Sequence, residues 1–294
     1  MKLVVIGRHG QLARSLQERA AGFADIELVL SGRPEIDLES LDGLRSVIRV
    51  LSPDAVLNAA AYTAVDQAED EPERAWACNA DAPAVLAQVT AELGVPMIHI
   101  STDYVFAGDK PGAYRESDPT EPMGVYGQSK LAGEERVRSS NRDACIVRTS
   151  WLFSPFARNF VKTMLALAET RLEVAVVSDQ VGSPTSALDL ADGLLTMASL
   201  WASGGTTGQG ETYHLAGSGA ASWAEVAEAI FIEARRNGLH DANVRPITTA
   251  KYPTKAVRPR NSVLDSSKFT AQFGFVMPDW RTSIRDVVPR CATN

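Results

Sequence analysis

Tyr126 and Lys130 are the two side chains whose types and spacing could perform acid–base chemistry in this sequence. They stand four residues apart in Val125-Tyr-Gly-Gln-Ser-Lys130, and positions i and i+4 of a helix share one face. A neighbouring ammonium favours the phenolate and therefore lowers the pKa of a tyrosine from about 10. Such a tyrosine can exchange a proton with a substrate oxygen near neutral pH. Because the same pair occurs on ordinary solvated helices, the elements that would position it decide between the two interpretations.

The N-terminus has the pattern of a strand, a glycine turn and a helix. Lys2-Leu-Val-Val-Ile6 is a short apolar run typical of a buried strand, and Gly7-Arg-His-Gly10 follows it directly. Gly7 permits a tight turn, Gly10 lets the backbone approach a pyrophosphate, and the N-terminus of the next helix offers free N–H groups to it. The pattern, with Ala13 as its last small residue, predicts a dinucleotide site. Its expected members are Gly7, Gly10, Gln11 and Leu12.

The second predicted strand, Ile26-Glu-Leu-Val-Leu30, bears on the choice of dinucleotide. An acid near its end would bind a ribose 2′-hydroxyl and indicate NAD, but residues 30–33 contain none. Ser31 and Arg33 stand there instead, and an arginine can pair with a 2′-phosphate. We therefore expect NADPH as the preferred cofactor and NADH as the alternative, although Arg33 could also be a solvated loop charge. Asp37 and Leu38 are expected beside the adenine.

Small residues follow the third predicted strand, Ala55-Val-Leu-Asn58. The segment Ala59-Ala-Ala61 would let the backbone lie close to a cofactor, and a plain turn of small residues is the other interpretation. We expect Ala60, Ala61, Tyr62 and Thr63 to line the ribose and nicotinamide side of the cofactor.

Hydroxyl and carboxyl groups follow the predicted strand from Val95 to Ile100. Ser101, Thr102 and Asp103 stand at its carboxyl end, and ligands of open α/β sheets bind outside the carboxyl ends of the strands. A hydroxyl there can face Tyr126 across a substrate carbonyl. The same residue types also cap helices, which is the structural alternative.

The composition is that of a globular protein of 294 residues with a net charge of −7 and no long basic run, so a nucleic-acid surface is not expected. Three cysteines without a C-x-x-C motif and four scattered histidines predict neither a disulfide framework nor a metal site, and His99 is expected to be a packed strand residue. The N-terminus has no signal-peptide pattern and no apolar stretch reaches about 18 residues. These features predict a cytoplasmic protein without a membrane span.

Alternating strand and helix patterns continue through residue 150 and predict an α/β fold with a Rossmann-type doubly wound parallel sheet. Residues 1–150 are expected to form the dinucleotide-binding domain. Residues 151–294 are expected to form mainly a smaller substrate-binding lobe, with segments at about 172–177 and 212–237 returning to the sheet. A long helix is predicted from Glu73 to Leu93, kinked or broken at Pro83. Ser222-Trp-Ala-Glu225 is a capping box that predicts the start of another helix.

Taken together, these motifs resemble the extended short-chain dehydrogenase/reductase family, which uses a hydroxyl, a tyrosine and a lysine with a nicotinamide cofactor. Within it the chain is most similar, over nearly its whole length, to the reductases that complete dTDP-L-rhamnose synthesis. The landmarks are Gly7-Arg-His-Gly-Gln-Leu12, Asn58-Ala-Ala-Ala-Tyr-Thr-Ala-Val-Asp66, Ser101-Thr-Asp-Tyr-Val-Phe106, Val125-Tyr-Gly-Gln-Ser-Lys-Leu-Ala-Gly-Glu134, Arg148-Thr-Ser-Trp151, Asn159-Phe-Val-Lys-Thr-Met164, Asp179-Gln-Val-Gly-Ser-Pro-Thr185 and Arg258-Pro-Arg-Asn-Ser262. Ala13 replaces a glycine often found in the family.

The resemblance implies reduction of the C4 ketone of dTDP-4-dehydro-L-rhamnose by NADPH, a precursor step for cell-surface polysaccharide. It assigns catalysis to Thr102, Tyr126 and Lys130, and it also assigns Tyr126 and Lys130 to the cofactor, with Lys130 on the nicotinamide ribose. It assigns substrate binding to Thr102, Asp103 and Trp151, and the nucleotide diphosphate to Arg258 and Arg260. Trp151 as a core residue and the arginines as a solvated basic stretch are the alternatives. Some family members are magnesium-bridged dimers, but no acidic cluster here carries that property over, so we expect a monomer or homodimer without a metal.

Two other functions remain open at the level of sequence. A nucleotide-sugar epimerase or dehydratase shares the tyrosine–lysine motif but regenerates its cofactor. A non-catalytic regulatory subunit like that of methionine adenosyltransferase shares the fold, but the intact trio of Thr102, Tyr126 and Lys130 argues against this role.

Overall fold

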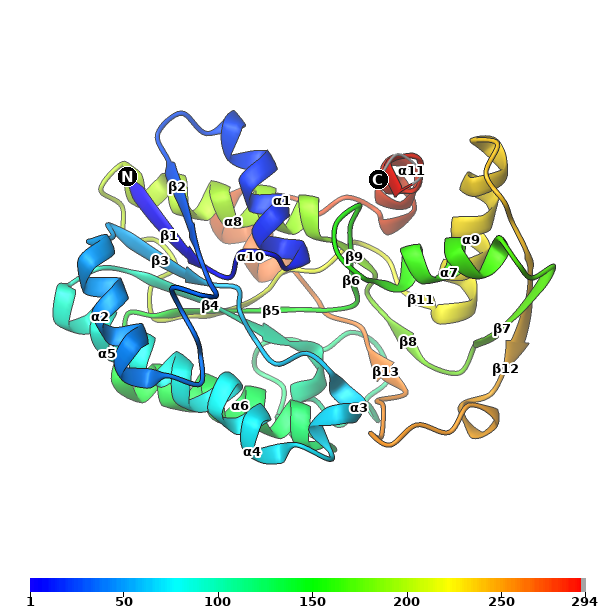
Figure 1. Ribbon diagram of the computed structural model, residues 1–294, viewed down its shortest axis with the longest axis horizontal. Coiled ribbons are helices and arrows are strands. Elements are labelled where there is room, and N and C mark those ends of the chain that lie inside the picture. The colour runs from blue at the N-terminus through cyan, green and yellow to red at the C-terminus, as the bar shows by residue number, and fades with distance from the viewer. Residues whose placement is uncertain (292–294) are drawn as a thin grey trace.

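A six-stranded parallel sheet forms the centre of the computed structural model, which describes residues 1–291 (Figure 1). Its strands, in spatial order, are β2 (Glu27–Ser31), β1 (Lys2–Ile6), β3 (Ala55–Asn58), β4 (Met97–Thr102), β5 (Cys145–Thr149) and β10 (Thr212–His214). The predicted α/β fold with a doubly wound parallel sheet is confirmed.

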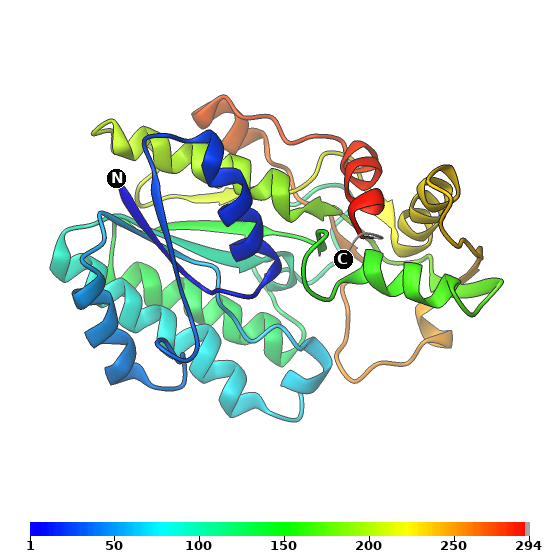
Figure 2. The ribbon, with the colours of Figure 1, turned by 45° about the horizontal axis from the view of Figure 1, so that its top comes forward.

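Helices cover both faces of this sheet because successive strand residues point to opposite sides. Leu3 and Val5 of β1 pack into one core with helices α1 (Gln11–Arg19), α8 (Ala187–Ala202) and α10 (Ser267–Phe273). Val4 and Ile6 pack into the other core with α2 (Leu41–Leu51), α5 (Ala82–Leu93) and α6 (Val125–Ser140). Figure 2 shows the sheet between these two helix layers. Continuous apolar runs such as Leu3–Ile6 are therefore explained by burial on both faces.

The order of the strands determines where a ligand can bind. The chain leaves β1 for β2 on one side and returns to β3 on the other, so the sheet has its topological switch point beside β1. Gly7 leaves β1 with a φ of 122°, which favours glycine, and its N–H donates to the Ser31 carbonyl at 2.7 Å. The carboxyl ends of β1, β3 and β4 thus bring Gly7, Ala59 and Ser101 to one edge.

The predicted helix from Glu73 to Leu93 is interrupted, as the sequence indicated. After α3 (Val65–Ala68), α4 (Pro72–Trp76) leads into a π-helical turn over Ala77–Asp81, and α5 continues from Ala82. Pro83 lacks an N–H and its ring crowds the carbonyl of the residue four positions earlier, which is Asn79. The π-helical turn therefore lies where the proline disturbs the regular hydrogen-bond pattern.

The second half of the chain contributes a further lobe with its own apolar core (Figure 1). Helices α7 (Phe160–Ala168), α9 (Trp223–Arg236) and α11 (Trp280–Cys291) pack against a two-stranded parallel sheet of β7 (Glu173–Val177) and β12 (Asn243–Ile247). The remaining short strands are β6 (Leu152–Phe153) with β9 (Thr185–Ser186), and β8 (Val181–Gly182) between β11 (Ala221–Ser222) and β13 (Asn261–Ser262). Single 3₁₀ turns lie at Ala20–Gly22, Asp103–Val105 and Thr249–Lys251.

One part of the predicted topology is wrong. The segment at 172–177 does not return to the central sheet, because β7 pairs with β12 instead. Of the segment at 212–237, Thr212–His214 joins the central sheet, whereas α9 packs in the second core. A strand pattern identifies a buried extended segment but not its partner. The division of the chain into two domains at residue 150 stays a prediction.

The predicted capping box is confirmed at the start of α9. The Ser222 hydroxyl accepts the Glu225 N–H at 3.2 Å, and the Glu225 carboxylate accepts the Ser222 N–H at 2.7 Å. These two bonds satisfy N–H groups that a helix N-terminus otherwise leaves free. They also fix the position of Trp223, the first residue of the helix.

Within residues 1–291, no helix has the length and apolar character that crossing a membrane requires.

We predict that Gly133→Ala destabilises the protein, because α6 packs directly on the π-helical turn at this residue. A Cβ at Gly133 would lie 2.0 Å from the Asn79 carbonyl oxygen, which is a backbone atom that cannot rotate away. Overpacking of this kind lowers the free energy of unfolding by about 1–3 kcal/mol. Urea denaturation would measure it. Gly22→Ala is the matched control, since no atom lies within 4 Å of its Cβ, and equal stabilities of the two variants would contradict the expectation.

Candidate active site

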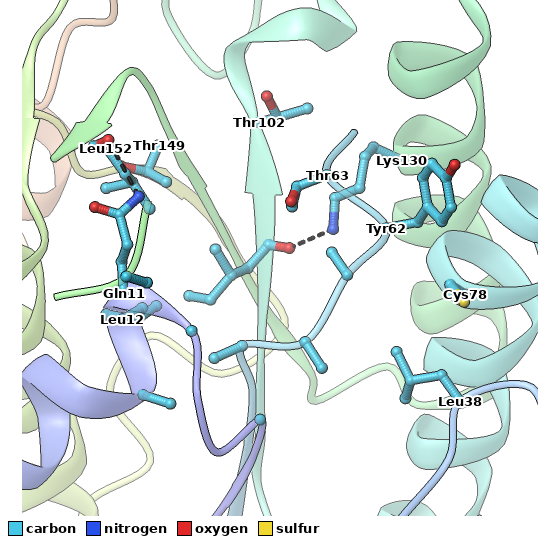
Figure 3. Close-up of a pocket in the computed structure, with 18 of the residues that line it drawn as sticks. Gln11, Leu12, Leu38, Tyr62, Thr63, Cys78, Thr102, Lys130, Thr149 and Leu152 are labelled. Atoms are coloured by element: carbon cyan, nitrogen blue, oxygen red, sulfur yellow. Dashed lines mark hydrogen bonds between the residues drawn. The ribbon is translucent and has the colours of Figure 1, made fainter. Parts of the chain in front are cut away.

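A cavity of about 750 Å³ lies at the carboxyl edge of β1, β3 and β4 and extends to the second lobe (Figure 3). Most of the residues predicted from sequence line it. These are Gly7, Gly10, Gln11, Leu12, Arg33, Leu38, Ala60, Ala61, Tyr62, Thr63, Thr102, Asp103, Tyr126, Lys130 and Trp151. The predicted residues outside its lining are Ser31, Asp37, Arg258 and Arg260.

Lys130 projects from α6 to the end of β4 and is almost completely buried. Its ammonium donates to the Ile100 carbonyl oxygen at 2.7 Å, as the dashed line in Figure 3 marks. Burial lowers the pKa of Lys130 to about 8, and the Glu134 carboxylate one turn along the helix opposes this shift. The ammonium is thus held at a fixed point of the cavity and remains mostly protonated at neutral pH.

Tyr126 lies on the same helix face, beside Thr102 and Tyr104. Its ring meets the Tyr104 ring edge-on, with 5.6 Å between the centroids. Burial raises the pKa of Tyr126 to about 12, the adjacent Thr102 hydroxyl lowers it, and the Asp103 carboxylate raises it. The expectation that Lys130 depresses this pKa is wrong here, because desolvation outweighs the other influences and the ammonium points to Ile100. Tyr126 is therefore a neutral phenol at neutral pH, which is the form that can donate a proton.

Thr102 and Asp103 are held together at the end of β4. The Thr102 hydroxyl donates to the Asp103 carboxylate at 3.0 Å, and the Ser150 hydroxyl donates to its other oxygen at 2.9 Å. Asp103 is 2% exposed, and burial raises its pKa to about 6. The expected capping role is also present, since Thr102 accepts the Tyr104 N–H at 3.3 Å. Thr102 therefore has the structural role, and its predicted catalytic role stays a prediction.

Two further hydroxyls of the cavity lining have no partner in the part of the chain that the structure describes. The side-chain oxygens of Ser101 and Thr149 are buried at the ends of β4 and β5 without a hydrogen bond. Buried hydroxyls are normally paired, so these two are exceptions among the buried polar groups at the ends of the strands.

The glycine turn at the start of α1 fits a pyrophosphate. Gly10 is the N-cap of α1, and no side chain caps this end of the helix. No protein atom lies within 4 Å of a Cβ built on Gly10, so the space above the first turn is open. Free N–H groups at a helix N-terminus with open space in front of them are suited to an anion.

The far end of the cavity carries paired charges. Arg33 contacts Asp37 at 3.0 Å and Glu39 at 2.9 Å, and Arg74 contacts Glu39 at 3.2 Å. Arg33, Glu39 and Arg74 line the cavity, whereas Asp37 lies behind them. Ser31 is buried at the end of β2 and contributes its carbonyl to the Gly7 turn. Arg33 therefore lies on the cavity wall and shares its charge with two carboxylates.

The second half of the chain contributes a pair of stacked indoles. The rings of Trp151 and Trp223 lie parallel, with 3.5 Å between their centroids, and both residues line the cavity. A Cβ at Gly182 would lie 2.4 Å from the Trp151 ring, so this glycine is required for the position of the indole. Trp151 has a φ of 45°, an uncommon value for a residue with a side chain. Trp151 therefore lines the cavity and also packs against the second apolar core, so its assignment to the sugar stays a prediction.

Arg258 and Arg260 are not brought into the cavity. The Arg258 guanidinium pairs with Asp66 of α3 at 2.7 Å and lies beside the Tyr104 phenol. Arg260 contributes its carbonyl to the Val181 N–H. Their assignment to the nucleotide diphosphate stays a prediction.

Several cavity residues were not predicted from the sequence. Trp223 and Arg158 come from the second lobe, Tyr104 from the turn after β4, and Arg74 from α4. Asn79, in the π-helical turn, binds both backbone polar groups of Tyr62 and donates to the Ser129 hydroxyl at 3.0 Å. The position of Pro83 four residues later was the available sequence signal for an unusual turn at Asn79.

Other titratable groups have structural surroundings. His99 is buried in β4 with its ring 3.1 Å from the Asn58 amide, which confirms the prediction of a packed residue. Cys78, Cys145 and Cys291 are buried free thiols, and Cys78 also lines the cavity. Across residues 1–291, no three His, Cys, Asp or Glu side chains are grouped so that they could hold a metal ion.

Comparisons with known proteins agree with this geometry. The family profile described as "RmlD substrate binding domain" matches residues 1–293. A dTDP-4-dehydrorhamnose reductase of Sinorhizobium fredii is 45% identical over 98% of this chain and 97% of its own length, and that of Escherichia coli K12 is 38% identical over 97% and 96%. The chain belongs to the dTDP-4-dehydrorhamnose reductase family. The predicted resemblance and the prediction of a nicotinamide-dependent oxidoreductase are thereby confirmed.

Solved structures of this reductase family have the same fold. A reductase of Clostridium acetobutylicum superposes with a TM-score of 0.89 at 35% identity, covering 98% of both chains. A reductase of Bacillus anthracis, solved in complex with NADP, has a TM-score of 0.88 at 34% identity and covers 97% of this chain and 98% of its own. A dTDP-glucose 4,6-dehydratase of Streptomyces venezuelae is 19% identical at a TM-score of 0.84, which shows a shared fold alone.

We predict that Lys130→Met stabilises the protein at pH 7 and that this gain disappears at high pH. The pKa of Lys130 is lowered from 10.5 to about 8, so the unfolded state binds more protons between these values. Below pH 8, burial of the protonated lysine therefore lowers the free energy of unfolding by about 3 kcal/mol. This penalty disappears as the pH rises to about 10.5. Loss of the hydrogen bond to the Ile100 carbonyl in the variant offsets about 1 kcal/mol of the expected gain in stability. Urea denaturation of both proteins at pH 7 to 10 measures the difference, and a pH-independent difference would contradict this prediction.

Proposed function

We propose that this protein reduces the C4 ketone of dTDP-4-dehydro-L-rhamnose to dTDP-L-rhamnose with NADPH. The observation that carries the proposal is the convergence of Thr102, Tyr126 and Lys130 on one cavity beside an open, uncapped helix N-terminus. Membership in the reductase family supports the choice of the sugar nucleotide.

The cavity has the groups that a nicotinamide dinucleotide needs. Gly10, Gln11 and Leu12 would hold the pyrophosphate through their backbone N–H groups, and Ala60, Ala61, Tyr62 and Thr63 would line the ribose. The unpaired Ser101 and Thr149 hydroxyls would bind the nicotinamide end. Arg33 would contact the 2′-phosphate, with Leu38 beside the adenine. When bound, the cofactor supplies the hydride for the ketone carbon.

Tyr126 would donate its proton to the oxygen of the ketone as that oxygen becomes an alkoxide. Burial keeps the phenol protonated before the reaction, because its pKa is about 12. A developing alkoxide is a stronger base than the phenolate, so the proton moves toward the sugar. General acid catalysis of this kind contributes about 10²–10⁴-fold to a rate.

Lys130 would stabilise the phenolate that remains on Tyr126, and Thr102 would act on the sugar oxygen. The Lys130 ammonium is fixed by Ile100 and adds a positive charge next to the reacting groups. Thr102 would hydrogen-bond the sugar oxygen, and donors aimed at a developing oxyanion each contribute about 3 kcal/mol. Asp103, anchored by Ser150, would accept a hydrogen bond from a sugar hydroxyl.

Trp151 and Trp223 would form an aromatic wall for the sugar. Since the two indoles cover each other, the sugar would contact the exposed parts of the pair rather than the shared faces. Arg158, an exposed cation of the lining, is a candidate for the diphosphate in addition to Arg258 and Arg260. A cytoplasmic location and a monomeric or homodimeric state remain part of the proposal.

Consumption of the cofactor distinguishes this reaction from that of the related epimerases and dehydratases. We expect dTDP-4-dehydrorhamnose to oxidise NADPH in a 1:1 ratio, measured by absorbance, with dTDP-L-rhamnose identified by NMR. Catalytic conversion of the sugar without net NADPH oxidation would indicate an epimerase or dehydratase. No turnover at all, with the sugar nucleotide bound, would indicate the non-catalytic binding role.

Cofactor preference is tested by Arg33→Ala. Because a 2′-phosphate would bind this guanidinium and a 2′-hydroxyl would not need it, the KM for NADPH should rise about tenfold or more, while the KM for NADH should stay within about twofold. Arg49→Ala is the matched control, since Arg49 lies on α2 and pairs with Glu92 outside the cavity. Equal losses for NADPH and NADH would remove the assignment of Arg33.

A further inference from the structure

The side chain of Gln11 lies in the phosphate-binding turn but is directed toward the second half of the chain. Its amide nitrogen donates to the Leu152 carbonyl at 3.3 Å, which Figure 3 marks with a dashed line. Its amide oxygen accepts the Ser154 hydroxyl at 3.0 Å. Both polar ends of Gln11 are therefore used to hold a segment that follows it by more than 140 residues.

Ser154 connects Gln11 to the start of α7. It is fully buried, and its hydroxyl accepts the Phe156 N–H at 3.1 Å. Its one proton lies between the Gln11 amide oxygen at 3.0 Å and the Phe156 carbonyl oxygen at 2.9 Å. The Asn159 amide donates to the Ser154 carbonyl at 2.8 Å, while the Asn159 oxygen caps α7 by accepting the Lys162 N–H. A continuous hydrogen-bonded path therefore runs from the first turn of α1 to the first turn of α7.

The segment held in this way forms one wall of the cavity. Trp151, Leu152, Ala157 and Arg158 all line it. Trp151 and Ala157 have φ values of 45° and 50°, and such conformations of residues with side chains persist only where their surroundings enforce them. The Arg14 guanidinium of α1 also lies 4.4 Å from the centre of the Phe156 ring. Contacts from α1 thus help to enforce the shape of residues 151–158.

We infer that Gln11 is a positioning residue for the sugar-nucleotide site, which it holds in place from within the cofactor turn. Its backbone serves the pyrophosphate, whereas its side chain fixes the wall that carries Trp151 and Arg158. The inference rests on the proposed function for the identity of the ligand. It predicts that a change in the cofactor turn acts on the sugar nucleotide rather than on NADPH.

Gln11→Leu, of similar volume, removes both hydrogen bonds and tests this assignment. With NADPH bound, we expect the Kd of dTDP, measured by calorimetry, and the KM of dTDP-4-dehydrorhamnose to rise about tenfold, since two hydrogen bonds to the wall are lost. The Kd of NADPH alone, measured by fluorescence, should change less than about twofold. Ser154→Ala should give a smaller effect of the same kind, and the double variant should match Gln11→Leu because both act through one path.

Gln17→Leu is the matched control, because Gln17 is exposed on the same helix and should leave all three constants unchanged. An increase in the NADPH Kd with an unchanged dTDP Kd would overturn the inference, as would unchanged constants in Gln11→Leu and Ser154→Ala. The dTDP titration requires no turnover, so it distinguishes failure of this link from failure of the proposed reaction, which the wild-type assay reports.

Discussion

The buried ammonium of Lys130 is the interaction on which the arrangement of the site depends. Its bond to the Ile100 carbonyl joins α6 to the end of β4, so that the helix carrying Tyr126 and the strand delivering Thr102 and Asp103 share one reference point. Burying a lysine is unfavourable, as its lowered pKa reflects, and the fold compensates only in part through Ile100 and Glu134. Stability is therefore lower at the place where the proposed mechanism requires a fixed positive charge.

The second half of the chain contributes residues to the cavity and elements to the central sheet. β10, α8 and α10 belong to the central sheet and its cover, although they follow residue 150 in sequence. Trp223 and the segment 151–158 reach the cavity from the other lobe. The Asp66–Arg258 pair and the Gln11–Ser154 bond connect the first part of the chain with the second. The sugar and the cofactor are therefore expected to meet in a space whose walls come from distant parts of the sequence.

Most of the central sheet could be predicted because buried parallel strands are short continuous apolar runs, and the predicted bounds of β3 agree with the structure. Most of the site residues that were predicted from the motifs likewise line the cavity. The partner of β7 could not be predicted, since strand pairing is decided by packing far along the chain. The pKa of Tyr126 was predicted in the wrong direction because spacing reveals a neighbouring charge but not desolvation. Trp223 was missed because its helix start gives no sign of stacking on Trp151.

The most direct test of the account is the rate of NADPH oxidation by Tyr126→Phe with dTDP-4-dehydrorhamnose. Phenylalanine keeps the ring against Tyr104 but removes the proton donor, so kcat should fall about 10³-fold. The Kd of NADPH should stay within about twofold, which would separate loss of chemistry from loss of binding. A rate near that of the wild-type protein would contradict the assignment of Tyr126 as the proton donor and, with it, the central role given to its helix.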